Sequence, residues 1–135
     1  MCGYQEVNKK YVLLISVVAL LSASAAMAHH SFRVVFDKEQ PIEVSGKIAG
    51  VDWKNPHVWF HVDVDNPDGE TERWSFEMGS PNALVRRGWS HRTLQVGDEV
   101  TVAGARARDG STRGAALSVT LADGRSLFSG QNVEQ

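Results

Sequence analysis

Cysteine and basic charge are both scarce in this sequence. Cys2 is the only cysteine among 135 residues, so an intrachain disulfide is excluded and the core alone must hold the fold. Acidic residues outnumber basic ones, 16 to 14, which gives a net charge of −2. A general nucleic-acid-binding domain usually carries a basic excess, so this class is disfavoured.

Catalytic signatures are also missing from the sequence. It contains no G-x-S-x-G elbow, no phosphate-cradling glycine loop and no H-E-x-x-H pair. Ser75 has no evident base and orienting partner, and Glu77 could form an acid/base pair only with His57 or His61 across a hairpin. We therefore assign no catalytic residue and favour a protein that is not an enzyme.

The N-terminus has the pattern of an export signal. Lys9 and Lys10 precede an apolar run over residues 12–21, and small residues follow up to the A-x-A site that ends at Ala28. A membrane span needs roughly 20 apolar residues, so a retained anchor is the weaker alternative. We predict a signal peptide over residues 1–28, cleavage after Ala28 or Ala26, and a periplasmic mature protein.

The rest of the chain alternates between apolar and polar residues, as β-strands do. We expect an N-terminal arm over residues 29–40, a β domain over 41–128 and a tail over 129–135. Ile42, Val44 and Ile48 share one parity in the first expected strand. Gly46 and Gly50 would let that strand bend sharply.

A hairpin and a short helix follow the first strand. Residues 58–64 and 74–78 alternate on either side of the turn sequence Asn-Pro-Asp-Gly at 66–69. Ser80 is a suitable N-cap, Pro81 suits the first helical position and Gly88 suits the end.

Two further strands are expected around residues 100–103 and 117–121, each next to an Asp-Gly or Gly-Asp turn. The order of three strands, a short helix and two strands predicts a five-stranded barrel of the oligomer-binding (OB) type. A small open β-sandwich is the alternative.

The candidate ligand-binding residues gather on the predicted hairpin. His57, Trp59 and His61 have outward parity on one strand and Glu77 lies on the next, with Trp53 expected nearby. Exposed aromatic and polar groups of this kind form binding platforms. The alternatives are a merely half-exposed strip, or tryptophans packed under the arm or the helix. Arg106, Arg108 and Arg113 flank a turn and form either an anion site or a solvated hairpin tip.

The candidate metal ligands are His29, His30 and His57. Cleavage after Ala28 makes His29 the first residue, and cleavage after Ala26 puts it third. In both cases the free amine and an imidazole can chelate Cu(II), which binds nitrogen donors tightly. His57 and His61 lie four residues apart, about 13 Å along a strand at about 3.3 Å per residue, which is too far for one ion.

Six short motifs together resemble an uncharacterised bacterial family of small exported proteins, a domain of unknown function. They are HHSF at 29–32, WKNPH at 53–57, WSFEMGSP at 74–81, RGW at 87–89, VGD at 96–98 and RDG at 108–110. The resemblance implies export and a compact β domain. It transfers no activity and no assigned site.

The sequence therefore supports three hypotheses of function. The first is an exported, non-enzymatic periplasmic binding module for an unknown small ligand. The second is a copper-handling protein that uses the N-terminal histidines. The third is an accessory subunit of an envelope complex, docked through its tryptophan-rich face or a strand edge.

Overall fold

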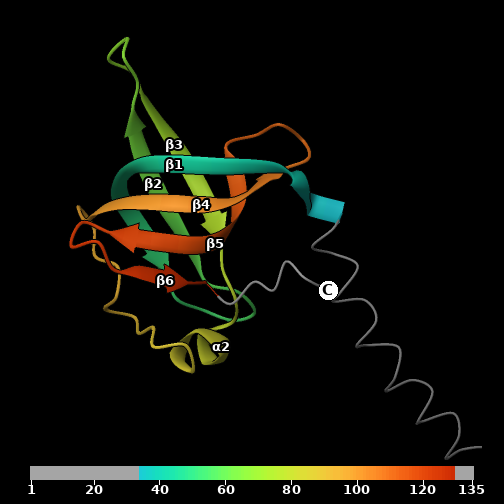
Figure 1. The fold of residues 1–135 in the computed structure, drawn as a ribbon, viewed down its shortest axis with the longest axis vertical. Helices are drawn as coiled ribbons and strands as arrows, with labels where there is room; N and C mark the ends of the chain where they lie inside the picture. The colour runs from blue at the N-terminus through green and yellow to red at the C-terminus, as the bar shows by residue number, and fades with distance from the viewer. Residues whose placement is uncertain (1–33, 130–135) are drawn as a thin grey trace, which may run out of the picture. The chain divides into compact units, whose positions relative to one another are not determined.

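A computed structural model describes residues 34–129, which form a six-stranded sheet with a short helix between the third and fourth strands (Figure 1). The elements are β1 (Phe36–Asp52), β2 (Trp59–Asp65), β3 (Thr71–Glu77), α2 (Pro81–Val85), β4 (Glu99–Ala107), β5 (Arg113–Leu121) and β6 (Ser126–Phe128). The mainly β prediction is confirmed. The predicted count of five strands is wrong, because Ser126–Phe128 pairs with β5 as a sixth. The predicted signal peptide lies outside the described residues, as do all but the first residue of the predicted tail.

Strand β1 is the longest element and pairs on both sides. Its residues 36–47 pair with β4 and its residues 47–52 pair with β2, and Figure 1 shows it curving between the two. It begins at Phe36, so residues 36–40 of the predicted arm belong to the strand. The polar sequence before Pro41 hid this extension, because Phe36 and Asp37 pair with β4 across an irregularity in the register.

The sheet order is β3-β2-β1-β4-β5-β6, and an additional pairing joins β3 to β5. In that pairing Ser75, Phe76 and Glu77 run parallel to Arg113, Gly114 and Ala115. All the other pairings are antiparallel.

The core lies on the inner face of the sheet. The alternation predicted for the hairpin is confirmed, since Phe60, Val62, Trp74 and Phe76 are all buried. The rings of Phe60 and Phe76 stack with centroids 5.4 Å apart. Burying an aromatic side chain of this size stabilises the fold by about 1.5–3 kcal/mol, so this hairpin is a major source of stability.

Helix α2 has the predicted start but ends early. The Ser80 hydroxyl accepts a hydrogen bond from the backbone N–H of Ala83, and Pro81 occupies the first turn. The helix ends at Val85 with Arg86 as its cap, and after the cap the N–H groups of Arg87 and Gly88 bond to carbonyls only three residues back. No helix within residues 34–129 has the length and apolar character to cross a membrane.

Two glycines permit close approach of neighbouring strands. A Cβ atom at Gly46 would overlap the carbonyl oxygen of Asp63, and one at Gly104 would overlap that of Ala115. Gly50 is different, because its Cβ would meet only the His61 ring, at 3.6 Å. The close strand approach at Gly46 therefore excludes a side chain there, whereas the register irregularity between β1 and β2 lies between Ile48 and Gly50.

We expect Gly104→Ala to destabilise the protein by about 1–3 kcal/mol, since backbone atoms would have to move to admit the methyl group. Gly50→Ala is the matched control and should change the free energy of unfolding by less than about 1 kcal/mol. Urea denaturation measures both. Equal losses in the two variants would contradict the close-packing explanation.

Candidate functional site

The candidate site is a strip on the outer face of the sheet, built by β2, β3 and β5 and flanked by β1. Trp59 on β2 lies opposite Asp52 on β1 and Glu77 on β3, and the next outward position of β2 places His61 opposite Ser75. Ser75 in turn lies beside Arg113 of β5. We call the set of His57, Trp59, His61, Ser75, Glu77 and Arg113 the outer strip.

His57 contacts Glu77 at one end of the outer strip. The ladder continues past β2, because the N–H of Val58 donates to the Gly79 carbonyl and the N–H of Met78 donates to the Val58 carbonyl. Val58 is fully buried, so it anchors the residue before it. The Nδ1 atom of His57 then meets Oε1 of Glu77.

Glu77 is a half-buried carboxyl group in this pair. Its side chain is only 15% exposed, against 43% for His57. Burial raises the pKa of Glu77 above its ordinary value, although the charges of His57 and Arg113 oppose the shift. Burying a carboxyl group costs free energy, which an outer sheet face does not ordinarily require. Carboxyl groups with shifted pKa values cluster at functional sites.

Trp59 lies at the centre of the outer strip. The guanidinium carbon of Arg113 lies 5.3 Å from the centroid of its ring, in a cation–π contact. The parallel pairing of β3 with β5 makes this contact, since it brings Arg113 next to the hairpin. The partly exposed indole and the exposed guanidinium therefore form one surface.

His61 joins the third and first strands of the site. Its Nδ1 atom hydrogen-bonds to the Ser75 hydroxyl at 2.9 Å, and its Nε2 atom lies 3.7 Å from Oδ2 of Asp52. Ser75 therefore does have a base and an orienting carboxylate nearby, contrary to the sequence analysis. Three strands had to be in register to bring them together.

This geometry favours binding over catalysis. The Ser75–His61–Asp52 line resembles a base-activated hydroxyl, but the 3.7 Å separation exceeds hydrogen-bond distance. The backbone N–H of Ser75, which could have stabilised an oxyanion, donates instead to the Thr112 carbonyl. The contacts of His61 with Ser75 and Asp52 are suited to holding these three side chains in fixed positions on the outer face.

The remaining predicted residues lie apart from the strip. Trp53 packs against the core. Trp89 is buried and its indole N–H donates to the Phe128 carbonyl. Among the three arginines near the turn, Arg106 lies over Trp74 and Arg108 pairs with Asp37, so they do not join Arg113 in one anion site.

The metal prediction concerns residues that the structure mostly leaves out. His29 and His30 lie outside the described residues, so the copper hypothesis stays a prediction. Within residues 34–129, no group of three or more His, Cys, Asp or Glu side chains could hold a metal ion. His57 and His61 have different partners, Glu77 and Ser75.

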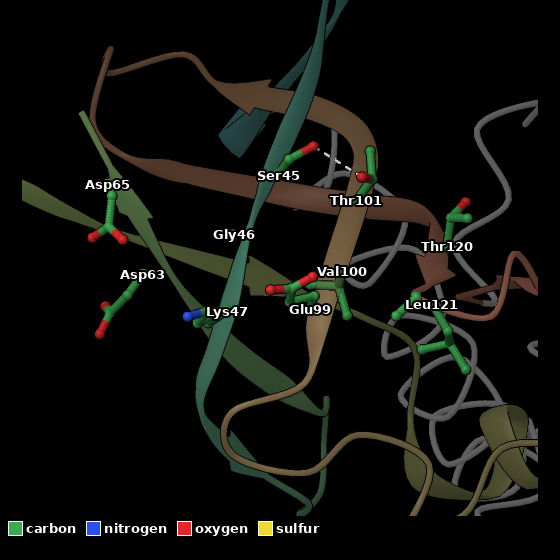
Figure 2. A pocket seen from close by; sticks show the side chains of 11 residues that line it. Ser45, Gly46, Lys47, Asp63, Asp65, Glu99, Val100, Thr101, Thr120 and Leu121 are labelled. Carbon is green, nitrogen blue, oxygen red and sulfur yellow. Dashed lines mark hydrogen bonds between the residues drawn. The ribbon is translucent and has the colours of Figure 1, made fainter. Parts of the chain in front are cut away.

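A groove of about 440 Å³ lies beyond His61 on the same outer face, because Asp63, the next outward residue of β2, lines it. Figure 2 shows the residues that line this groove. Asp63 and Lys47 are cross-strand partners in it, and Ser45 and Thr101 share a hydrogen bond of 2.8 Å. Asp63 is already held by Arg73 through two bonds of 2.7 and 2.9 Å. The groove contains none of the predicted ligand-binding residues.

Sequence reasoning missed Arg113, Ser75 and Asp52 as neighbours of the predicted residues. Counting outward from the 66–69 turn places Ser75 opposite His61, so that contact could be predicted from the sequence. The position of Arg113 depends on a pairing between strands far apart in sequence, for which the sequence has no local signal.

Comparison with known protein families gives a match over most of the chain. The model of a protein family described as a family of unknown function, DUF6152, matches residues 17–116. No curated protein matches the chain.

Titration of Glu77 should affect stability. Because its folded pKa is raised, the folded chain retains a proton that the unfolded chain loses, so stability falls as pH rises from the ordinary value of 4.5 through the folded pKa. Glu77→Gln should remove this loss, and its stability relative to the parent should increase over that pH range. Denaturation at each pH measures the free energy of unfolding. Glu43→Gln, at an exposed position of β1, is the control variant. A constant difference between Glu77→Gln and the parent would contradict the assignment.

The contact between Trp59 and Arg113 should be measurable by itself. In a double-mutant cycle of Trp59→Ala and Arg113→Ala we expect a coupling of about 0.5–1 kcal/mol in unfolding free energy. A control cycle of Trp59→Ala and Arg125→Ala should show no coupling, because Arg125 bonds to Asp123 in another hairpin. A zero value for the first pair would show that the cation–π contact contributes nothing.

Proposed function

The chain belongs to DUF6152, and since that family has no known function, we propose from the site itself that the protein is a non-enzymatic binding module. We propose that it is exported to the periplasm and takes a small ligand on the outer strip. The observation that carries the proposal is the half-buried Glu77, paired with an accessible His57 beside the Trp59–Arg113 surface.

The outer strip costs stability that the fold itself does not require. An outer sheet face can be covered by exposed polar residues, without desolvating a carboxyl group. Here the burial of Glu77 raises its pKa. Polar groups held in fixed positions around an aromatic ring are typical of ligand sites, and this supports binding as the function.

We also propose that the sheet is a barrel of the OB type. Pairings run from β1 to β2, β2 to β3, β3 to β5, β5 to β4 and β4 back to β1, so five strands follow one another in a ring. The long bent β1 and the helix between β3 and β4 support this reading. In such folds the outer face of the second and third strands often binds ligands, which is where the outer strip lies.

Thermal shift and NMR titration test the binding proposal. Acetate, phosphate, methylammonium and glucose are added singly to the purified protein, and a ligand at 100 times its Kd should stabilise the fold by about 2.7 kcal/mol. We expect the indole N–H signal of Trp59 to move in the titration that stabilises the protein.

Trp59→Ala should abolish that stabilisation, and Thr71→Ala should preserve it. Thr71 lies on the same hairpin, where its hydroxyl bonds to Asp65 outside the outer strip. Ligands whose effect survives Trp59→Ala bind elsewhere. If no member of a broad panel moves the melting temperature or the Trp59 signal, the binding module is refuted.

A further inference from the structure

We propose that the outer strip recognises an oxyanion of its ligand, a carboxylate or a phosphate, through the guanidinium of Arg113. This inference rests on the proposed binding function and specifies its chemistry. Arg113 was considered in the sequence only as part of an arginine group at a turn. The structure separates it from that group and places its guanidinium over the Trp59 ring.

The guanidinium of Arg113 is held in position. Arg113 is the first residue of β5, and its backbone pairs with Ser75 in the parallel β3–β5 contact. Its side chain lies over the Trp59 ring at 5.3 Å. An arginine stacked on an aromatic ring loses less freedom on binding, because part of its ordering cost has already been met.

The hydrogen-bond donors of Arg113 are available. Within residues 34–129, the ring contact with Trp59 is the one direct interaction of its side chain, with no hydrogen bond or ion pair to an acceptor. A guanidinium has five N–H donors in a rigid fork that matches the two oxygens of a carboxylate or phosphate. Arg108, by contrast, pairs with Asp37 at 3.2 Å.

The acidic groups near Arg113 are engaged with other partners. The positive charge of Arg113 acts to lower the pKa of Glu77 and of Asp109. The Glu77 carboxylate contacts His57, and that of Asp109 accepts bonds of 2.6 and 3.0 Å from Ser111. Neither carboxylate occupies the fork, so the fork can accept an oxyanion from outside.

The rest of the strip suits the body of such a ligand. The exposed imidazole of His57 can hydrogen-bond to it, and the Trp59 ring offers an apolar surface. The groove beyond His61 does not suit an anion, because Asp63, Asp65 and Glu99 line it against the single cation Lys47. Charge therefore places the oxyanion at Arg113.

Titration with small ions tests the inference. Acetate and inorganic phosphate are added to the ¹⁵N-labelled protein, with sodium chloride at equal ionic strength, acetamide and methylammonium as comparisons. We expect at least one of the two oxyanions to shift the Arg113 Nε–H and Trp59 indole signals saturably, and the other probes not to do so. Whichever binds more tightly identifies the carboxylate or phosphate as the preferred group.

Three variants make the test specific. Arg113→Gln should weaken oxyanion binding about tenfold or more, since it removes the charge and the fork. Arg113→Lys should recover only part of the loss, because a lysine keeps the charge without the fork. Arg125→Gln, which removes another exposed arginine, should bind like the parent. Denaturation curves check that each variant is folded.

The outcomes separate this inference from the binding function. Shifts that chloride reproduces, or that persist undiminished in Arg113→Gln, overturn the oxyanion assignment. If acetamide, glucose or methylammonium binds at Trp59 while both oxyanions fail, the strip is still a ligand site and only its chemistry was wrong. If no probe of any class binds, both proposals fall.

Discussion

The parallel pairing of β3 with β5 is the constraint on which the rest of the site depends. It involves only three residues from each strand, yet it connects the hairpin of β2 and β3 to the strands that follow the helix. It also sets Arg113 beside Ser75 and over Trp59. Without this contact the outer strip would have its histidines and its acid but no cation in a fixed position.

Close packing of the backbone makes that pairing compatible with the rest of the sheet. Gly104 on β4 lies against the carbonyl of Ala115, which is itself one of the β5 residues that pair with β3. Gly114 faces the Phe76 ring, which is part of the core. Small residues on β4 and β5 thus let the core reach its full density while the outer faces of the same strands carry the polar groups.

Much of the fold could be predicted because its signals are local. The turn at 66–69, the alternation on either side of it and the Ser80–Pro81 helix start all depend on residues close in sequence. The start of β1 was misplaced, since Phe36 is paired by a strand about 70 residues later. The strand at Ser126–Phe128 was missed because three residues are too few to show a period.

The site was predictable only in part, for the same reason. Parity alone placed His57, Trp59 and His61 on one outer face and suggested Glu77 as a partner across the hairpin. It could not choose between the two histidines, and the structure pairs Glu77 with His57. Trp53 was expected near them without an assigned parity, and it packs against the core.

The outer strip draws all its side chains except that of His57 from the paired strands β2, β3 and β5, and Asp52 of β1 flanks it. Asp52, Trp59, Ser75 and Arg113 each belong to a separate paired strand. Hydrogen exchange at their backbone amides should therefore follow opening of the sheet as a unit. A ligand that bridges these strands would slow that opening. Ligand binding would therefore slow hydrogen exchange throughout the sheet and not only at the site.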